Sequence, residues 1–323
     1  MEDLLIIGSR VLGVFLVMFA GAFCRRMHWL TEESDRSLAN LTANLLLPAL
    51  FFERVVMGDS VQSLGAAWVP ILAGFLTTSI GFILGYVFAI TCGPWIGLHN
   101  VARQSAFALC VGICNYGYIP LPLAQQFYPQ AEVTLIIHNV GVDVSMWSVG
   151  VLIVAGRSQT RIRRLLTSPP LLAVFIAVLM RQLGAQSWLP QPLLYTSKAL
   201  GGCAIPLGLL LSGAIMVDYL PRLRLRESGR VFGAAIVLRL AIFPMLMLLA
   251  TQLLVRDILL QQVMLLQAAM PAAMFPIVLV RLYDQDVPTA VQVVACTTLV
   301  ALLTIPLWLA GGGMWLGLPM LSE

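Results

Sequence analysis

The sequence has few charged residues and almost no lysine. Charged residues make up 11% and hydrophobic residues 59% of its 323 positions, and one lysine accompanies 18 arginines. A soluble domain cannot bury this much apolar surface, and the mean hydropathy is +0.91. The net charge of +4 does not indicate nucleic-acid binding, because the arginines lie in short segments between apolar runs. We therefore predict a helical protein that crosses the membrane several times.

The sequence also lacks the common metal, disulfide and catalytic motifs. Its six cysteines lie in or beside apolar segments without a CxxC pair or a Cys/His cluster, so we expect no metal site and no disulfide framework. A Walker motif is absent, which argues against direct use of ATP. An intramembrane enzyme would need a GxGD pair, an HExxH motif or a Ser/His or Ser/Lys pairing, and none is found. We predict neither an enzyme nor a cofactor.

Ten apolar segments have about the length that a helix needs to cross the bilayer, roughly 20 residues. The run 68–91 carries no charge over 24 residues. The first segment is expected to be a membrane helix rather than a cleavable signal peptide, because its start is acidic and its arginine pair follows the apolar stretch. The ten predicted helices cover residues 4–24, 36–57, 66–91, 101–127, 131–155, 167–186, 195–218, 229–253, 257–283 and 287–313.

The cations are distributed unevenly between the predicted loops. Thirteen arginines lie on the side that follows helices 1, 3, 5, 7 and 9, whereas five cations lie on the other side. Because cytoplasmic loops are enriched in Lys and Arg, we expect both termini outside and the clusters 157–164 and 222–230 in the cytoplasm. We interpret these clusters as topology signals near anionic lipid. The expected location is the inner (plasma) membrane.

The two halves of the sequence resemble each other at an offset near 155 residues, since Tyr128 in QQFYPQAEV matches Tyr283 in VRLYDQDVPTAV. Pro48 in LLLPALFF similarly corresponds to Pro206 in CAIPLGLLL. An odd number of five helices per half turns the second half upside down, as in many secondary transporters. We expect a first repeat at 1–156, a cytoplasmic linker at 157–166 and an inverted second repeat at 167–323.

Predicted helices 4 and 9 both contain helix-breaking prolines. Helix 4 includes CVGICNYGYIPLPLAQQFYPQ (110–130), and helix 9 includes QAAMPAAMFPIVLV (267–280). Proline removes a backbone donor and clashes with the preceding turn, so both helices should unwind there. Unwound backbone at this depth is tolerated only inside protein or beside a wet cavity. Interrupted helices at matching positions of two repeats therefore predict a substrate site at their crossing, although two kinked structural helices remain an alternative.

The chain resembles the auxin efflux carrier family, whose bacterial members include malonate and malate carriers. The resemblance covers nearly the whole chain and is carried by NLTANLLLPALFF, NYGYIPLPLAQQFY, HNVGVDVSMWSVGVLI, SPPLLAVFIAVL, AIPLGLLLSGA and AMPAAMFPIVLVRLYDQD. It implies ten helices in two inverted repeats, similar to the fold of bile-acid:sodium symporters. It also implies a scaffold domain of helices 1, 2, 6 and 7, a transport domain of helices 3–5 and 8–10, and a substrate where helices 4 and 9 cross.

The sequence departs from the plant carriers of this family at the crossing. Those carriers have an Asn-Pro pair in both broken helices, whereas here Asn115 has no adjacent proline and Met270 precedes Pro271. The long cytoplasmic loop of the plant hormone carriers is also missing. We therefore expect a small organic anion, a mono- or dicarboxylate, rather than auxin.

Polar residues near the predicted breaks are the candidates for substrate contact. The Asn115 amide could bind a carboxylate or cap the freed backbone, and Tyr116 and Tyr118 could donate hydroxyl groups or only pack. We expect the half-helix that begins near Pro120 to aim N–H groups at an anion. The candidate substrate-binding residues are Asn44, Asn115, Tyr116, Tyr118, Pro120, Arg239, Gln267, Met270 and Pro271.

Asp143 lies near the middle of predicted helix 5, with Asn139 one turn earlier on the same face. A charge at the bilayer centre costs about 2.5–3.5 kcal/mol on insertion scales, so such a residue is a candidate proton carrier. The alternative is a structural ion pair with Arg239 of helix 8. Asn139 and His138 are candidate proton-coupling residues together with Asp143, and the alternative for His138 is a satisfied interfacial histidine.

The predicted function is a secondary transporter of a small organic anion, working by alternating access and driven by protons or the membrane potential. The alternatives are a sodium-coupled symporter of the same fold, or a channel or non-transporting receptor. The expected partners are the anion and the lipid bilayer, without nucleic acid, and a homodimer is a further expectation.

Overall fold

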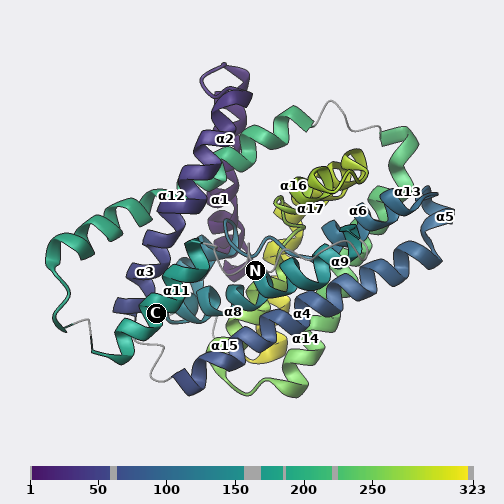
Figure 1. Ribbon diagram of the computed structural model, residues 1–323. Helices are drawn as coiled ribbons and strands as arrows, with labels where there is room; N and C mark the ends of the chain where they lie inside the picture. Colours follow the sequence, from purple (N-terminus) through teal and green to yellow (C-terminus); the bar gives the residue numbers. More distant parts are fainter. Residues whose placement is uncertain (1, 59–63, 156–168, 185–186, 220–224, 319–323) are drawn as a thin grey trace.

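The computed structural model describes residues 2–58, 64–155, 169–184, 187–219 and 225–318 (Figure 1). Within these ranges the chain is helical apart from loops and one isolated antiparallel bridge between Cys114 and Ala272. The predicted all-helical class is confirmed. The predicted linker 157–166 and part of the cluster 222–230 lie outside the described residues.

The first half contains two long helices and several interrupted ones. In chain order the elements are α1 (Glu2–Arg26), α2 (Glu32–Leu41), η1 (Thr42–Leu46), α3 (Leu47–Met57), α4 (Leu64–Thr91), α5 (Gly93–Ile96), α6 (Val101–Gly112), α7 (Pro120–Phe127), η2 (Pro129–Ala131), α8 (Glu132–Ser145), η3 (Met146–Gly150) and α9 (Val151–Ala155).

The second half also contains long helices and interrupted ones. Its elements are α11 (Pro169–Gln182), α12 (Gln191–Tyr219), α13 (Leu225–Val237), η6 (Leu238–Ile242), α14 (Phe243–Leu254), α15 (Ile258–Ala269), α16 (Pro276–Leu282) and α17 (Val287–Leu316). The elements η1, η3 and η6 are single π-helical turns inside otherwise continuous helices, whereas η2 is a 3₁₀ turn.

Six helical segments of the described chain are long and apolar enough to cross a membrane. They are Leu4–Arg26, Trp68–Thr91, Pro129–Val154, Gln191–Asp218, Gly229–Leu254 and Val287–Leu316. Two shorter apolar helices are Pro169–Gln182 and Ile258–Ala269. The predicted spans 101–127 and 257–283 are each divided into two shorter helices, and neither half is long enough to cross a membrane by itself. The ten-helix inverted repeat stays a prediction.

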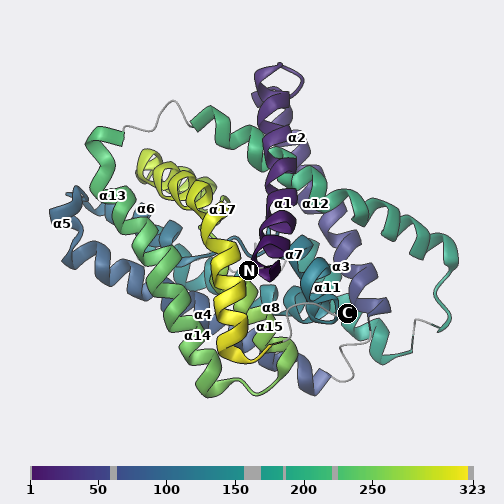
Figure 2. The same cartoon turned by 180° about the vertical axis from the view of Figure 1, so that it is seen from behind.

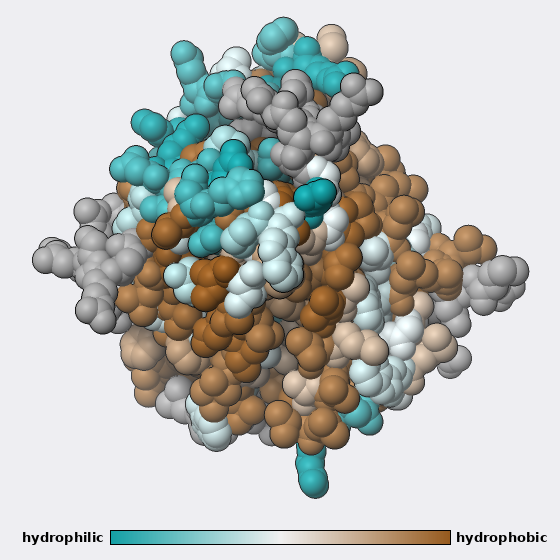
Figure 3. Space-filling view, turned by 90° about the vertical axis from the view of Figure 1, so that its right-hand side faces the viewer, coloured by the Kyte–Doolittle hydropathy of each residue, from teal (hydrophilic) through white to brown (hydrophobic). Residues whose placement is uncertain are grey.

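The outer surface fits an apolar environment. Large hydrophobic side chains on many helices are exposed, and Leu16, Phe175 and Leu303 are each more than half exposed. Hydrophobic residues cover the middle of the face in Figure 3, while hydrophilic residues gather at its upper end. This distribution is the one expected for an integral membrane protein.

The helices lie in two groups around the middle of the molecule. Helix α1 packs on α12, α3 packs on both α11 and α12, and α4 packs on α6 and α8. In Figures 1 and 2, α5, α6 and α13 lie on the opposite side of the molecule from α3 and α11. Helix α17 contacts α1, α6, α13 and α15, so it joins the two groups.

Glycines allow the closest helix contacts. A Cβ atom added to Gly213 of α12 would lie 1.7 Å from the carbonyl oxygen of Met18, and one added to Gly21 of α1 would lie 1.9 Å from that of Leu210. The backbones of α1 and α12 are thus in direct contact. Small residues at such crossings are typical of membrane helices, where packing rather than water exclusion holds the helices together.

We expect Gly213→Val to destabilise the protein by about 1–3 kcal/mol, since α1 and α12 must separate to accept the side chain. Gly202 of the same helix is the matched control, because a Cβ there has no heavy atom within 4 Å. Thermal unfolding of the purified protein in detergent measures both. Equal losses for the two valine variants would contradict a packing role for Gly213.

Candidate functional site

The two interrupted helices meet at their breaks. Helix α6 ends at Gly112 and α7 begins at Pro120, while α15 ends at Ala269 and α16 begins at Pro276. The Asn115 N–H donates to the Pro271 carbonyl at 2.7 Å, and the Ala273 N–H donates to the Ile113 carbonyl at 3.1 Å. The predicted interruptions are therefore present, and the unwound segments satisfy each other's backbone groups.

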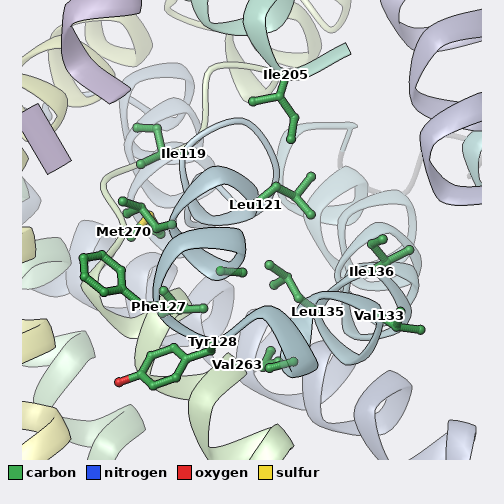
Figure 4. Packing of buried hydrophobic residues seen from close by; sticks show 14 of the residues in the cluster. Ile119, Leu121, Phe127, Tyr128, Val133, Leu135, Ile136, Ile205, Val263 and Met270 are labelled. Atoms are coloured by element: carbon green, nitrogen blue, oxygen red, sulfur yellow. The ribbon is translucent and has the colours of Figure 1, made fainter. Parts of the chain in front are cut away.

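Buried side chains also hold the crossing. The side chain of Thr297 on α17 accepts a hydrogen bond from the Ala272 N–H at 3.2 Å. On the first-half side, α7 lies in a buried apolar cluster that includes Ile119, Leu121 and Met270 (Figure 4). The breaks are thus fixed within protein rather than exposed to lipid, as unwound backbone at this depth requires.

Gln267 of α15 connects the two breaks with α8. Its side-chain N–H donates to the Asn139 side-chain oxygen at 3.0 Å and to the Tyr116 carbonyl at 3.4 Å. Its side-chain oxygen accepts from the Cys114 thiol at 2.9 Å. Asn139 in turn donates to the Tyr116 carbonyl at 2.7 Å. Because Gln267 is fully buried, each of these bonds replaces one that water would otherwise make.

Asp143 lies one turn beyond Asn139 on α8. The Tyr116 hydroxyl donates to its Oδ1 atom at 2.7 Å. Asp143 is half-buried, so it meets both this network and the neighbouring cavity. The carboxyl group is consequently held in place by a residue of the unwound segment.

A cavity of about 400 Å³ adjoins the crossing. Its polar side chains are those of Asn44, Asn115, Tyr116, Tyr118, Asn139 and Asp143, and its other lining residues are Ala43, Leu47, Phe51, Gly117, Met146, Trp147, Pro169, Pro170, Ala273, Met274 and Phe275. The Trp147 and Phe275 rings meet edge to face with centroids 6.0 Å apart. The cavity thus combines aromatic walls with a few polar groups, which is typical of small-molecule sites.

Asn115 presents its amide to this cavity. The backbone N–H of Asn115 is used by Pro271, but its side chain makes no hydrogen bond within the described part of the chain. The alternative that the side chain caps the freed backbone is thus not what the geometry favours. The amide is available for a ligand.

Two expectations for the site differ from the structure. The start of α7 offers few N–H groups to an anion, since Pro120 and Pro122 have none and the Leu121 N–H already donates to the Gly117 carbonyl. Arg239 lies behind the crossing and forms no ion pair with Asp143. The alternative of an Asp143–Arg239 structural pair is therefore wrong.

The remaining predicted residues lie at varying distances from the cavity. Gln267, Pro120, Met270 and Pro271 belong to the crossing but do not line the cavity. His138 is buried outside it, and neither ring nitrogen has a hydrogen-bond partner within the described residues. In the same described residues, no group of three His, Cys, Asp or Glu side chains could hold a metal ion.

The apolar walls of the cavity were not predicted from the sequence; they are chiefly Phe51, Trp147 and Phe275. One signal was available for Trp147, because it stands four residues after Asp143 and therefore on the same helix face. Phe51 and Phe275 come from other segments, and their approach depends on how the helices pack.

Each π-helical turn holds a site residue. Asn44 lies in η1, Trp147 in η3 and Arg239 in η6. A π-helical turn widens the helix locally and changes the direction of the following side chains, and such turns are frequent at functional sites. They were not predictable from the periodicity of the sequence.

A cluster of charges closes the gap between α3 and α8 away from the cavity. Arg54 lies 3.4 Å from the carboxylate of Glu132, which also accepts from Gln125 at 2.7 Å. Glu132 precedes Asn139 by seven residues, so the ion pair lies about 10 Å from Asn139 along α8. Nearby, Arg10 of α1 donates to the Gln126 carbonyl at 2.5 Å.

Comparison with known proteins fits this arrangement of membrane helices around a polar crossing. A family model described as a membrane transport protein matches residues 6–162 and 158–309. The chain belongs to this family of membrane transport proteins. The molecule is thus an integral membrane protein and a transporter, which favours a non-enzymatic role.

Two curated relatives agree with this family over nearly the whole chain. An uncharacterized transporter from Methanothermobacter thermautotrophicus is 24% identical over 302 residues, which is 92% of this chain and 96% of the relative. An uncharacterized transporter from Methanocaldococcus jannaschii is 23% identical over 310 residues, again 92% of this chain and 96% of the relative.

We expect Gln267→Met to cost about 1–3 kcal/mol of stability, because the buried Tyr116 carbonyl and Asn139 side chain each lose a hydrogen bond. Gln262→Met is the matched control on α15, since the Gln262 side-chain oxygen has no partner in the described chain and its loss should be nearly neutral. Thermal unfolding in detergent checks both variants. A neutral Gln267→Met would show that the network does not hold the crossing together.

Proposed function

We propose that the protein is a secondary carrier that moves a small organic monoanion across the inner (plasma) membrane by alternating access. The observation that carries this proposal is the cavity at the paired breaks, with the unpaired Asn115 amide and Asp143 facing aromatic walls. The resemblance to the auxin efflux carrier family supports the same assignment, with the substrate at the crossing of two broken helices.

The lining fits a carboxylate attached to an apolar body. The Asn115 amide and the Tyr118 hydroxyl can donate to a carboxylate, and Phe51, Trp147 and Phe275 can cover the rest of the substrate. A dicarboxylate would place a second negative charge beside the apolar walls. A monocarboxylate is therefore the better candidate within the two classes expected from the sequence.

Asp143 is proposed as the proton carrier. An ionised Asp143 would repel an anion in the same cavity, whereas a protonated Asp143 is neutral and can donate a hydrogen bond to it. One proton and one monoanion then cross together, and the proton leaves Asp143 on the other side. Tyr116 donates to the carboxylate at 2.7 Å and so holds the carboxyl group in place beside the cavity.

An organic cation is the second candidate, and one observation favours it. An ionised Asp143 stands among the rings of Tyr116, Tyr118 and Trp147, and aromatic faces together with a carboxylate attract ammonium groups. The two candidates predict opposite dependence on Asp143, because a cation needs the negative charge and an anion needs it neutralised.

Flux measurements in liposomes test the assignment. The purified protein is given a panel of aromatic and aliphatic monocarboxylates, dicarboxylates and amines under imposed pH, sodium or potential gradients. Accumulation of a monocarboxylate under an inward proton gradient supports the proposal. Transport of amines alone would instead support an organic cation as the substrate. Flux that does not saturate with substrate concentration would indicate a channel.

We expect Asp143→Asn to abolish accumulation driven by a pH gradient while substrate exchange continues, because the amide keeps the hydrogen bonds but carries no proton across. Exchange of labelled for unlabelled substrate in the same liposomes is the internal control. Unchanged pH-driven accumulation by the variant would rule out Asp143 as the proton carrier.

The ion pair between Arg54 and Glu132 is proposed to hold α3 against α8 beyond one end of the cavity in this conformation. It joins α3 of the expected scaffold domain to α8 of the expected transport domain. Alternating access requires these two groups to separate when the cavity opens at that end.

A flexible thiol cross-linker applied to the Arg54→Cys/Glu132→Cys variant should stop flux, and cleaving the linker should restore it. The control pair is Phe23→Cys/Trp29→Cys, whose rings lie 5.9 Å apart at one end of α1 and should tolerate cross-linking. Treated wild type corrects for the native cysteines. Undiminished flux through the cross-linked Arg54/Glu132 pair would contradict a moving interface at this position.

A further inference from the structure

Arg239 is a buried cation without a carboxylate partner in the described chain. Its side chain is 4% exposed and stands in the π-helical turn η6. The Nε–H donates to the Met270 carbonyl at 3.1 Å, and an Nη2–H donates to the Gln267 carbonyl at 3.4 Å. The guanidinium carbon lies 5.9 Å from the centre of the Phe243 ring. The charge is therefore balanced by carbonyl dipoles and a ring face.

The carbonyl of Gln267 lacks its normal helical donor for a reason visible in the sequence. The N–H four residues later would belong to position 271, which is proline and has none. The Met270 N–H reaches the same carbonyl only at 3.3 Å. Both carbonyls stand at the C-terminal end of α15, where the helix dipole is negative. This end of the broken helix requires a donor or a positive charge.

Carbonyls at the C-terminal ends of broken helices are the groups that hold coupling sodium ions in many secondary transporters. We propose that the Arg239 guanidinium is a tethered cation that fills such a position, so that the transport cycle takes no sodium ion there. Removal of the side chain should leave a carbonyl-lined site for a small monovalent cation. The inference goes beyond the proposed function, because it concerns a second site and does not depend on which substrate is carried.

The sequence left two other roles open for Arg239, and the structure supports neither. As a substrate ligand, Arg239 would face the cavity, but it does not line it. As a partner of Asp143, it would neutralise the proposed proton carrier, but the two form no ion pair. Bonded to the carbonyls of Gln267 and Met270, it stabilises the break itself and leaves Asp143 free to change its charge.

The test compares thermal unfolding in sodium chloride with unfolding in choline chloride at equal ionic strength. We expect wild type to unfold at the same temperature in both salts. Arg239→Ala should unfold at a lower temperature in choline, with a clear gain in sodium and in millimolar guanidinium, which restores the missing group. Arg10→Ala is the control, because Arg10 also donates to a backbone carbonyl but at a partly exposed position, and it should show no cation-specific gain.

Two further measurements keep the test decisive if Arg239→Ala fails to fold. Arg239→Lys retains the charge and should remain indifferent to sodium, and Arg239→Met retains much of the volume but should be less stable than the lysine variant. Stabilisation of wild type by sodium, or sodium-driven uptake by wild type, would overturn the proposal. Wild-type stability of Arg239→Met in choline would also overturn it, because the charge would then have no role at the break.

Discussion

Two unwound segments inside an apolar protein must each find partners for backbone groups that proline leaves unpaired. Here they find them largely in one another. The Asn115 N–H donates to the Pro271 carbonyl, the Ala273 N–H donates to the Ile113 carbonyl, and Thr297 accepts the Ala272 N–H. An unpaired group in hydrocarbon costs several kcal/mol, so neither break is stable without the other. This mutual dependence fixes where α6, α7, α15 and α16 lie.

The remaining side chains of the site depend on this crossing. Gln267 and Asn139 both bond to the Tyr116 carbonyl, and the Tyr116 hydroxyl then reaches Asp143. The position of the Asp143 carboxyl is thus coupled to the break between α6 and α7, because Tyr116 belongs to that unwound segment. A change in the crossing during transport would move this carboxyl relative to the cavity, which is the link that the proposed proton coupling requires.

Charge is distributed in two separate places around the crossing. Asp143 faces the cavity, whereas Arg239 lies behind it on the carbonyls of Gln267 and Met270. A direct ion pair would have neutralised both charges, so that Asp143 could not carry a proton and Arg239 could not satisfy the carbonyls. Their separation lets one group serve the proposed proton transfer while the other satisfies the broken end of α15. The proposed tethered cation is consistent with proton rather than sodium coupling.

The membrane class, the helical composition and the two breaks could be predicted from the sequence alone. These follow from local properties: long apolar runs exclude a soluble core, and the paired prolines at 120/122 and 271/276 favour breaks. Single prolines do not enforce a break, because Pro206 and Pro306 lie inside continuous helices. The face shared by Asn139 and Asp143 was readable as well, because a spacing of four residues keeps side chains on one side of a helix.

The contacts between residues far apart in the chain depend on how the helices pack and could not be predicted in this way. Phe51, Trp147 and Phe275 form the cavity walls because three segments far apart in the chain approach one another, and no local pattern records that approach. The π-helical turns at Asn44 and Arg239 also rotate these side chains away from where a regular helix would place them. Arg239 binds carbonyls rather than Asp143 because the packing of α14 and η6 beside α15 sets its partners, and no local pattern in the sequence encodes that packing.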